Sequence, residues 1–425
     1  MFSFLDLRLK VTLLLSNMIA IVVAVFVLQP LSYIGDALAA TREDVKATET
    51  SPSSTCVTYD SNESVITITC KNAVRLSDID KQLNNAQVLK KESGDGSSRG
   101  GAASAKVWSL NAGLVIEKGS TLIIDSKDVK WLKIIADGTT AHGILVHGSL
   151  KIDSVKVTSW NPSTNDYGQS YGSRESSGRI THAGAPRPYI RIESDTAGTM
   201  NITNSEIAYL GYEAGFGAGT SGLHYSNAGN GSMIKNNDIH HLYFGLYTNN
   251  VGGLVIENNK VHDSGHYGLD PHTGTHDMII RNNIVYGNNG SAIICSLNCY
   301  NILIEGNKVY NNTGAGIAFS RNMFNSIARN NYIHDQEIAI HVSQSHDNEI
   351  YNNTISNAKT AITLTGGSVK NEIYHNTIMD TSQPLRNSTD NQENNIHSNR
   401  ILVNDSDTTK QQSKDNNNIK DANQN

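Results

Sequence analysis

The sequence has few of the residues on which several classes of protein depend. Its 425 residues include only 4 cysteines, too few for a disulfide-dense scaffold. Hydrophobic residues make up 38% and aromatic residues 6%, whereas glycine and asparagine are abundant, and this balance favours many short strands and turns over a helical bundle. Basic residues number 34 against 40 acidic ones, so the net charge is -6 and general nucleic-acid binding is not expected.

The beginning of the chain has the order of parts that is typical of an export signal. Arg8 and Lys10 precede an apolar run over 11–28, and Ala37 and Ala39, on either side of Leu38, offer a small-x-small cleavage site. The run approaches membrane-spanning length, so a retained anchor is the alternative. We therefore predict a signal peptide or anchor over 1–39, and an exported protein that is periplasmic, at the cell surface or extracellular.

The rest of the chain divides into a polar linker over 40–55, a long domain over 56–404 and a polar tail over 405–425 that we expect to be disordered. Cys56 and Cys70 flank a turn between two strand-like segments. A hairpin there places the two thiols opposite each other, so we predict a disulfide in a hairpin cap at the start of the domain.

The long domain contains a repeat. Segments such as IKNN, IENN, IRNN and IYNN recur every 22 to 24 residues, and such a period in an Asn- and Gly-rich sequence is typical of a parallel β-helix. The frame of leucine-rich repeats is absent. Asn suits the repeated turn because it tolerates a left-handed backbone and can bond to the Asn of the next coil. The last Asn residues of the segments are Asn237, Asn259, Asn283, Asn307, Asn331, Asn353 and Asn376.

Aligning the coils on one strand of each repeat separates the inward side chains from the outward ones, because side chains alternate along a strand. The expected inward columns are Leu223, Leu246, Leu269, Ile293, Ile317 and Ile340, and, two places on, Pro271, Cys295, Phe319 and Val342. The outward columns include His224, Tyr247 and Asp270, and, two places on, Asn249 and His272. We expect these outward residues to share one exposed patch.

The segment Tyr267–His272 is the most unusual part of the repeat. Pro271 stands inside a stacked strand, where proline removes a ladder donor and is disfavoured. It separates Asp270 and His272, which face the same side of the strand. Broken local rules in a regular fold are often found at functional sites, so we predict that this pair handles protons.

The segment resembles the Y-G-x-D-P-H signature of alginate (mannuronan) C5-epimerases, which convert mannuronate to guluronate within the polymer. Residues 157–161, 187–191, 204–211 and 241–247 resemble the same family, and the similarity runs from about Leu114 to Asn376. The resemblance implies an all-β fold, a right-handed parallel β-helix of about ten coils, and an anionic polysaccharide as substrate.

The resemblance also implies roles for individual residues. His272 matches the base that removes the C5 proton, Tyr267 is the candidate on the opposite face, and Asp270 matches the acid that meets the substrate carboxylate. The order of base and acid between His272 and Tyr267 stays open. His224, Tyr247 and Asn249 are candidates for binding the sugar in the groove.

One departure from the family concerns the cation that neutralises the substrate carboxylate. The family has a basic residue on the strand one coil after the signature, where this sequence has Leu297. Arg321 stands one coil further along the same column, at about twice the coil spacing. It is the candidate that replaces the missing cation and binds substrate.

Three alternatives stand besides an epimerase, and one of them, a periplasmic metal-delivery β-helix, is disfavoured because the dispersed His residues form no ligand cluster. A polysaccharide lyase shares proton abstraction at C5 but then eliminates the O4 substituent, and a carbohydrate-binding β-helix would keep the scaffold without the reaction.

Cys295 and Cys299 have no further ligands near them, so we expect no metal site; calcium at acidic turns stays open. We expect no cofactor, a monomer, and membrane contact only through a retained N-terminal segment.

Overall fold

The computed structural model describes residues 55–92, 106–168, 173–174, 180–182, 184–193, 198–214, 220–227, 231–388, 390 and 393–402. The predicted signal or anchor over 1–39, the predicted tail over 405–425 and all of the predicted linker except Thr55 lie outside these residues. In the segments so described, none of the helices has both the length and the apolar character needed to span a membrane.

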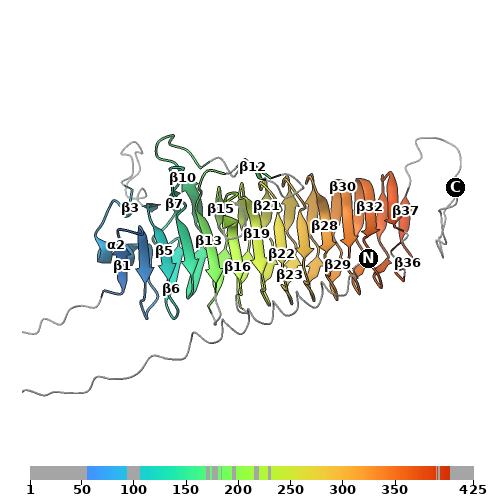
Figure 1. Cartoon of the computed structure of the whole chain (residues 1–425), viewed down its shortest axis with the longest axis horizontal. Coiled ribbons are helices and arrows are strands. Elements are labelled where there is room, and N and C mark those ends of the chain that lie inside the picture. The colour runs from blue at the N-terminus through green and yellow to red at the C-terminus, as the bar shows by residue number, and fades with distance from the viewer. Residues whose placement is uncertain are drawn as a thin grey trace, which may run out of the picture. The chain divides into compact units, whose positions relative to one another are not determined.

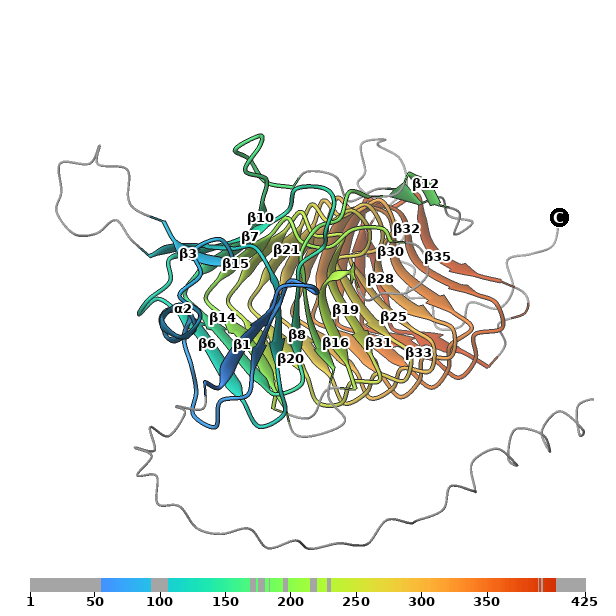
Figure 2. The same cartoon turned by 60° about the vertical axis from the view of Figure 1, so that its left-hand side comes forward.

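The described domain is a parallel β-helix, as predicted, in which successive coils stack along one axis (Figure 1; Figure 2). A complete coil contributes one strand to each of three ladders. Neighbouring strands within a ladder are parallel, except at the N-terminal end, where β3 (Leu89–Lys91) pairs antiparallel with β4 (Val107–Leu110). In the described residues one ladder contains eleven strands, and the other two form, together with β1 (Val57–Asp60), a sheet of 24. The prediction of about ten coils is therefore close.

We call the ladder that carries Asp270 and His272 the site ladder. Its strands are β2 (Val65–Ile68), β5 (Gly113–Ile116), β8 (Gly143–Val146), β13 (Tyr189–Glu193), β16 (Gly222–Ser226), β19 (Phe244–Asn249), β22 (Leu269–His272), β25 (Ile293–Ser296), β28 (Ala315–Ser320), the second halves of β30 (Tyr332–Ser343) and β32 (Thr354–Thr365), and β35 (Gln383–Asn387). Several of them follow one another along one face of the coils (Figure 2).

The other two ladders complete each coil. The second contains β3 (Leu89–Lys91), β4 (Val107–Leu110), β7 (Trp131–Ile135), β10 (Lys156–Trp160), β15 (Glu206–Ala208), β18 (Asp238–His240), β21 (Lys260–His262), β24 (Ile284–Tyr286), β27 (Lys308–Tyr310), the first halves of β30 and β32, β34 (Thr377–Met379) and β37 (Arg400–Leu402). The third contains β6 (Thr121–Asp125), β9 (Ser149–Asp153), β14 (Met200–Thr203), β17 (Met233–Lys235), β20 (Val255–Glu257), β23 (Ile279–Arg281), β26 (Leu303–Glu305), β29 (Ile327–Arg329), β31 (Glu349–Tyr351), β33 (Glu372–Tyr374) and β36 (Asn395–His397).

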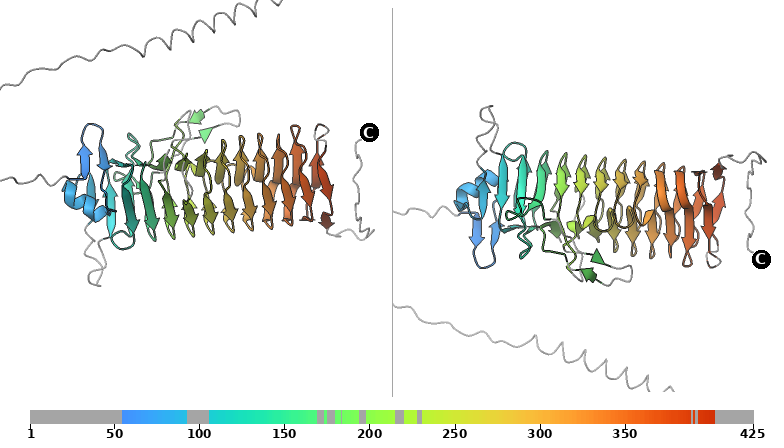
Figure 3. Two further views of the ribbon diagram at one scale, coloured as in Figure 1. Left: turned by 90° about the horizontal axis from the view of Figure 1, so that it is seen from below. Right: turned by 90° about the horizontal axis from the view of Figure 1, so that it is seen from above.

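Two short strands, β11 (Ser173–Arg174) and β12 (Ile180–His182), form a separate antiparallel sheet. This small hairpin projects beside the stacked coils (Figure 3).

The two Asn residues of each repeated pair have different roles at the turn before each strand of the second ladder. The first Asn of a pair, such as Asn282, adopts a left-handed backbone with φ of 56°. The second is buried and stacks on its equivalents: both the backbone N–H and Nδ2 of Asn283 donate to Oδ1 of Asn307, at 2.9 and 3.0 Å. Nδ2 of Asn283 also donates to the carbonyl of Ile256 at 3.0 Å, so the amide satisfies buried backbone groups that a turn leaves unpaired.

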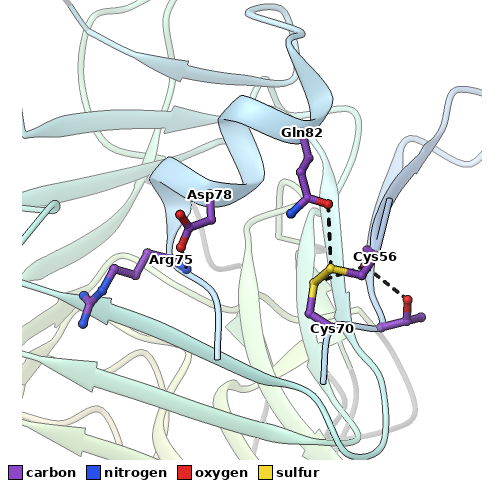
Figure 4. Close-up of a disulfide and its surroundings, with 6 residues drawn as sticks. Cys56, Cys70, Arg75, Asp78 and Gln82 are labelled. Atoms are coloured by element: carbon purple, nitrogen blue, oxygen red, sulfur yellow. Dashed lines mark hydrogen bonds between the residues drawn. A yellow bond between two sulfur atoms is a disulfide. The ribbon is translucent and has the colours of Figure 1, made fainter. Parts of the chain in front are cut away.

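The N-terminal end of the coils is covered by a hairpin and a helix. β1 (Val57–Asp60) pairs antiparallel with β2, and Cys56 and Cys70 are joined by the predicted disulfide, with 4.8 Å between their Cα atoms. Helix α2 (Leu76–Leu83) packs beside this bridge, with Oε1 of Gln82 3.7 Å from Sγ of Cys56 (Figure 4). The helix begins where the carboxylate of Asp78 accepts from the backbone N–H of Arg75 at 3.0 Å.

Inside the coils the predicted columns are confirmed. Leu269 pairs with Ile293 and Ile293 with Ile317, and all three are fully buried. Two places on, the inward column is also buried and consists of Pro271, Cys295, Phe319 and Val342. The strand alternation therefore sends Asp270 and His272 to the other side of β22, away from the core.

Candidate functional site

Strand β22 keeps its place in the ladder although Pro271 cannot donate a hydrogen bond. Its neighbours hold its carbonyl groups from the core side instead: Oγ1 of Thr275 donates to the carbonyl of His272 at 2.7 Å, and Sγ of Cys299 donates to that of Pro271 at 3.6 Å. Oγ1 of Thr275 also lies 2.9 Å from that of Thr248 in the preceding coil. These contacts fix the strand on which the two candidate groups stand.

Three of the predicted site residues occupy equivalent positions on consecutive strands, because His224 pairs with Tyr247 and Tyr247 with Asp270. The expectation of an exposed patch was wrong for them: their exposed fractions are 4%, 9% and 2%. Side chains crowd on the outer face of these coils. The ring of Tyr247 lies 5.0 Å from that of His224 and 5.8 Å from that of Phe244, measured between centroids.

Asp270 is a buried carboxyl group whose surroundings favour its neutral form. Burial raises its pKa well above the usual value, and the positive charge of Arg321 offsets this only in part. Its Oδ1 is buried, and among the described residues it has no hydrogen-bond partner. A buried, unpartnered carboxyl oxygen is costly, so such a group is expected where a ligand completes its hydrogen bonds.

His272 is neutral and its protons can be assigned from its neighbours. Burial first, and the charge of Arg321 second, lower its pKa to about 4. Nη2 of Arg321 lies 3.3 Å from Nε2 of His272, and a guanidinium can only donate, so Nε2 is the acceptor. The proton of the neutral ring is then on Nδ1, which lies 2.6 Å from Oγ1 of Thr273 and 3.2 Å from Oη of Tyr247.

The side chain of Arg321 reaches His272 across two coil spacings, the distance that the sequence alone could not show it to cover. His272, Ser296 and Ser320 occupy equivalent positions on three consecutive strands, and Arg321 follows Ser320 with a left-handed backbone, at φ of 53°. Its side chain turns back along this column, so that Nε donates to Oγ of Ser296 at 2.8 Å and Nη2 reaches His272.

The two candidate phenols are both protonated at neutral pH. Burial first, and the nearby carboxyl group of Asp270 second, raise the pKa of Tyr247 to about 12, and the same two causes raise the pKa of Tyr267. The two tyrosines approach from different places: Tyr247 stands on β19 beside His272, whereas Tyr267 lies in the turn before β22. There its ring packs on those of His266, at 4.0 Å, and Phe244, at 5.8 Å.

One further predicted residue and three residues that were not predicted lie around His272 and Asp270. Asn249 is half-buried and pairs with His272 in the ladder. Phe244, Thr273 and Ser296 also belong to the site but were not among the predicted site residues. Ser296 lies in the same outward column as His272, which is the signal in the sequence that could have identified it.

Comparison with known proteins agrees with this fold. Residues 200–424 match the family described as periplasmic copper-binding protein (NosD). The crystal structure of the periplasmic alginate epimerase AlgG is similar with a TM-score of 0.66 and 19% identity, over 80% of this chain and 85% of that one. The A-module of mannuronan C-5 epimerase AlgE4 from Azotobacter vinelandii has a TM-score of 0.46 and 18% identity, over 70% and 86% of the two chains. No curated protein matches by sequence.

The description of the matched family raises the question of a copper ion. Across the described ranges, no three His, Cys, Asp or Glu side chains come together in an arrangement that could hold a metal. Cys295 and Cys299 are free and buried, and burial raises the pKa of both thiols, that of Cys299 to about 12. Thiolates are the form of cysteine that binds metal, so these residues do not fit a copper site.

Proposed function

The chain belongs to the family described as periplasmic copper-binding protein (NosD), and we propose that within it the protein is an exported isomerase that inverts C5 of mannuronate-like residues in an anionic polysaccharide. One observation supports this most strongly. A neutral imidazole, a carboxyl group of raised pKa and a guanidinium converge on one outer face, at His272, Asp270 and Arg321. Proton abstraction next to a carboxylate requires groups of these three kinds.

The substrate carboxylate is neutralised before the proton leaves. In our proposal the protonated carboxyl of Asp270 donates a hydrogen bond to it, and Arg321 donates charge-assisted hydrogen bonds. Nε2 of His272 then takes the C5 proton, and the electron pair of the broken C–H bond moves into the carboxylate group, which becomes an enediolate. Both donors stabilise the charge where it develops.

A phenol returns a proton to the opposite face of C5. Tyr267 suits this step because its raised pKa keeps it protonated and because it comes from the turn before β22 rather than from the strand beside His272. Tyr247 lies on the side of the base, at Nδ1 of His272. The pKa directions therefore favour His272 as base and Tyr267 as acid, and exchange with solvent then restores both groups.

Export forms part of the proposal. The N-terminal segment over 1–39 has the parts of an export signal, and the description of the matched family is periplasmic. N-terminal sequencing of protein from its native host should begin near Ala40, or find the anchor retained in a membrane fraction. Full-length protein in the cytoplasm would contradict this part.

The reaction is tested with polymannuronate in deuterated water. An epimerase incorporates deuterium at C5 and inverts that centre, which NMR detects. A lyase, the main alternative, removes the same proton but produces an unsaturated uronate at a new chain end. A protein that only binds carbohydrate gives neither product.

A further inference from the structure

Arg321, the cation that binds the substrate carboxylate in the proposed site, belongs to a coil that is not adjacent to the coil of His272. Arg321 directly follows Ser320, which stands two strands away from His272 in the ladder. At the spacing of parallel strands, these two strands lie roughly 10 Å apart. A long, exposed arginine has many rotamers and loses conformational entropy when it is held in one of them. Its reach to His272 therefore needs a contact that fixes the side chain on the way.

Ser296 provides that contact. It stands midway between the two residues, on β25, its exposed fraction is 0%, and its Oγ accepts from Nε of Arg321 at 2.8 Å. The guanidinium is a planar fork, so fixing Nε also fixes the directions of the remaining N–H groups. One of these nitrogens, Nη2, meets Nε2 of His272 at 3.3 Å.

The contact between Arg321 and His272 occupies the lone pair of Nε2, which is the lone pair that takes the C5 proton in the proposed reaction. While Arg321 donates to Nε2 of His272, that nitrogen cannot accept a proton from the sugar. Hydrogen bonds between two charged groups are stronger than those to a neutral acceptor, so a carboxylate competes well for the guanidinium. A neutral sugar does not.

We propose that Ser296 is a positioning residue, which tethers Arg321 across β25 so that the guanidinium covers His272 in the free protein and turns to the carboxylate of a bound uronate. This deepens the proposed function and rests on it. It also assigns selectivity: uronates uncover the base, whereas neutral hexose polymers leave it covered.

The test compares three serine variants in the full chain. Ser296→Ala removes the tether, and Ser296→Thr keeps the hydroxyl. Ser320→Ala is the matched control, because Ser320 is the next serine of the same column and, in the described part of the chain, its hydroxyl makes no bond to Arg321. Loss of one hydrogen bond to a charged group should lower kcat/KM for C5 exchange on polymannuronate roughly 10- to 100-fold in Ser296→Ala. Ser320→Ala should stay within about threefold of wild type, and Ser296→Thr, which keeps the hydroxyl, should be more active than Ser296→Ala.

A second readout does not depend on activity. The NMR titration of the His272 imidazole, identified by its loss in His272→Gln, should report the low pKa of wild type. The pKa should rise in Arg321→Gln and in Ser296→Ala, stay low in Ser320→Ala, and rise no further in the double variant Ser296→Ala/Arg321→Gln, because both changes remove the same contact. Oγ of Thr273, Oη of Tyr247 and the charge of Arg321 face the ring, and only the last is altered.

The outcomes separate the two proposals. An active wild type with unchanged kcat/KM and unchanged His272 titration in Ser296→Ala overturns the role of Ser296 and leaves the epimerase intact. A wild type without C5 exchange, in which Ser296→Ala still raises the pKa of His272, overturns the epimerase and supports the tether. A rise in the pKa of His272 on addition of a neutral mannose oligomer that equals the rise on addition of a mannuronate oligomer overturns the selectivity.

Discussion

Oη of Tyr247 lies 3.2 Å from Nδ1 of His272, although the two residues are 25 positions apart and stand on neighbouring strands. Together with Arg321 at the other ring nitrogen, this contact determines the tautomer: Nδ1 carries the proton and Nε2 the lone pair. The base of the proposed reaction is thus ready in the neutral form at any pH well above the lowered pKa of about 4.

The pH dependence of the reaction follows from that shift. Because the neutral imidazole is the active form, kcat/KM for C5 exchange should rise with pH through about 4 and then reach a plateau. In Arg321→Gln the rise should move to higher pH, since the neighbouring positive charge that lowers the pKa of His272 is gone. A pH–rate profile whose acid limb lies at the ordinary pKa of histidine in wild type would contradict the assignment.

A cation introduced at the position that the family uses should compensate for the loss of Arg321. Arg321→Gln should lower C5 exchange by roughly 10²-fold or more, because a donor to the developing charge is removed. Adding Leu297→Arg should recover at least a tenth of the wild-type rate. Leu297 already adopts a left-handed backbone, with φ of 63°, so arginine adds no new backbone strain there.

The control for this rescue is Asn298→Arg in the same Arg321→Gln background. Asn298 is the exposed neighbour of Leu297 and also has a left-handed backbone, with φ of 60°. Equal recovery from both positions would mean that a general increase in positive charge, and not a cation at the site, restores activity.

Asp270 should lower the stability of the protein at neutral pH. Its folded pKa is raised above the unfolded value, so its favourable contribution is present below the unfolded pKa and is lost as the pH rises towards the folded one. The melting temperature of Asp270→Asn, relative to wild type, should therefore increase as the pH rises from about 4. C5 exchange should be lost in the same variant.

Asp277→Asn is the matched control for that measurement. Asp277 is exposed, and hydrogen bonds from His276 and Asn301 lower the pKa of its carboxylate. Its substitution should give no gain in melting temperature with rising pH. A similar gain in both variants would point to the change in net charge as the cause.

The stacked asparagines should contribute strongly to stability. Asn307→Ala leaves the backbone N–H and Nδ2 of Asn283 and the carbonyl of Ile280 without their buried partner. At about 1–3 kcal/mol for each unsatisfied group, the free energy of unfolding should fall by about 3 kcal/mol or more. Asn289→Ala is the control, because Asn289 is exposed and its side chain makes no hydrogen bond within the described residues; it should change the free energy of unfolding by less than about 0.5 kcal/mol. Urea unfolding of the two variants measures both values.

The repeat made the fold and the inward columns predictable. A period near 23 residues aligns equivalent positions, and alternation along a strand then separates Leu269 and Pro271 from Asp270 and His272. Alternation does not say what covers the outer face, which is why the burial of His224, Tyr247 and Asp270 was missed.

The position of Arg321 could not be derived from spacing for a related reason. A backbone register gives the distance between strands, but the direction of a long side chain depends on its own turn and on what it meets. Here the left-handed backbone at Arg321 and the hydroxyl of Ser296 decide it. The sequence also does not show which Asn of each pair adopts the left-handed backbone and which is buried and stacked, because both residues suit a turn.

Deuterium incorporation at C5 of polymannuronate by wild type and by His272→Gln tests most directly whether His272 is the base of an epimerase. We expect incorporation with inversion at C5 by wild type and a loss of roughly 10²- to 10⁴-fold in the variant. The melting temperature should be unchanged, because the side chain of His272 lies outside the core. Undiminished exchange in His272→Gln, or no exchange by wild type on any polyuronate, would contradict this role of His272.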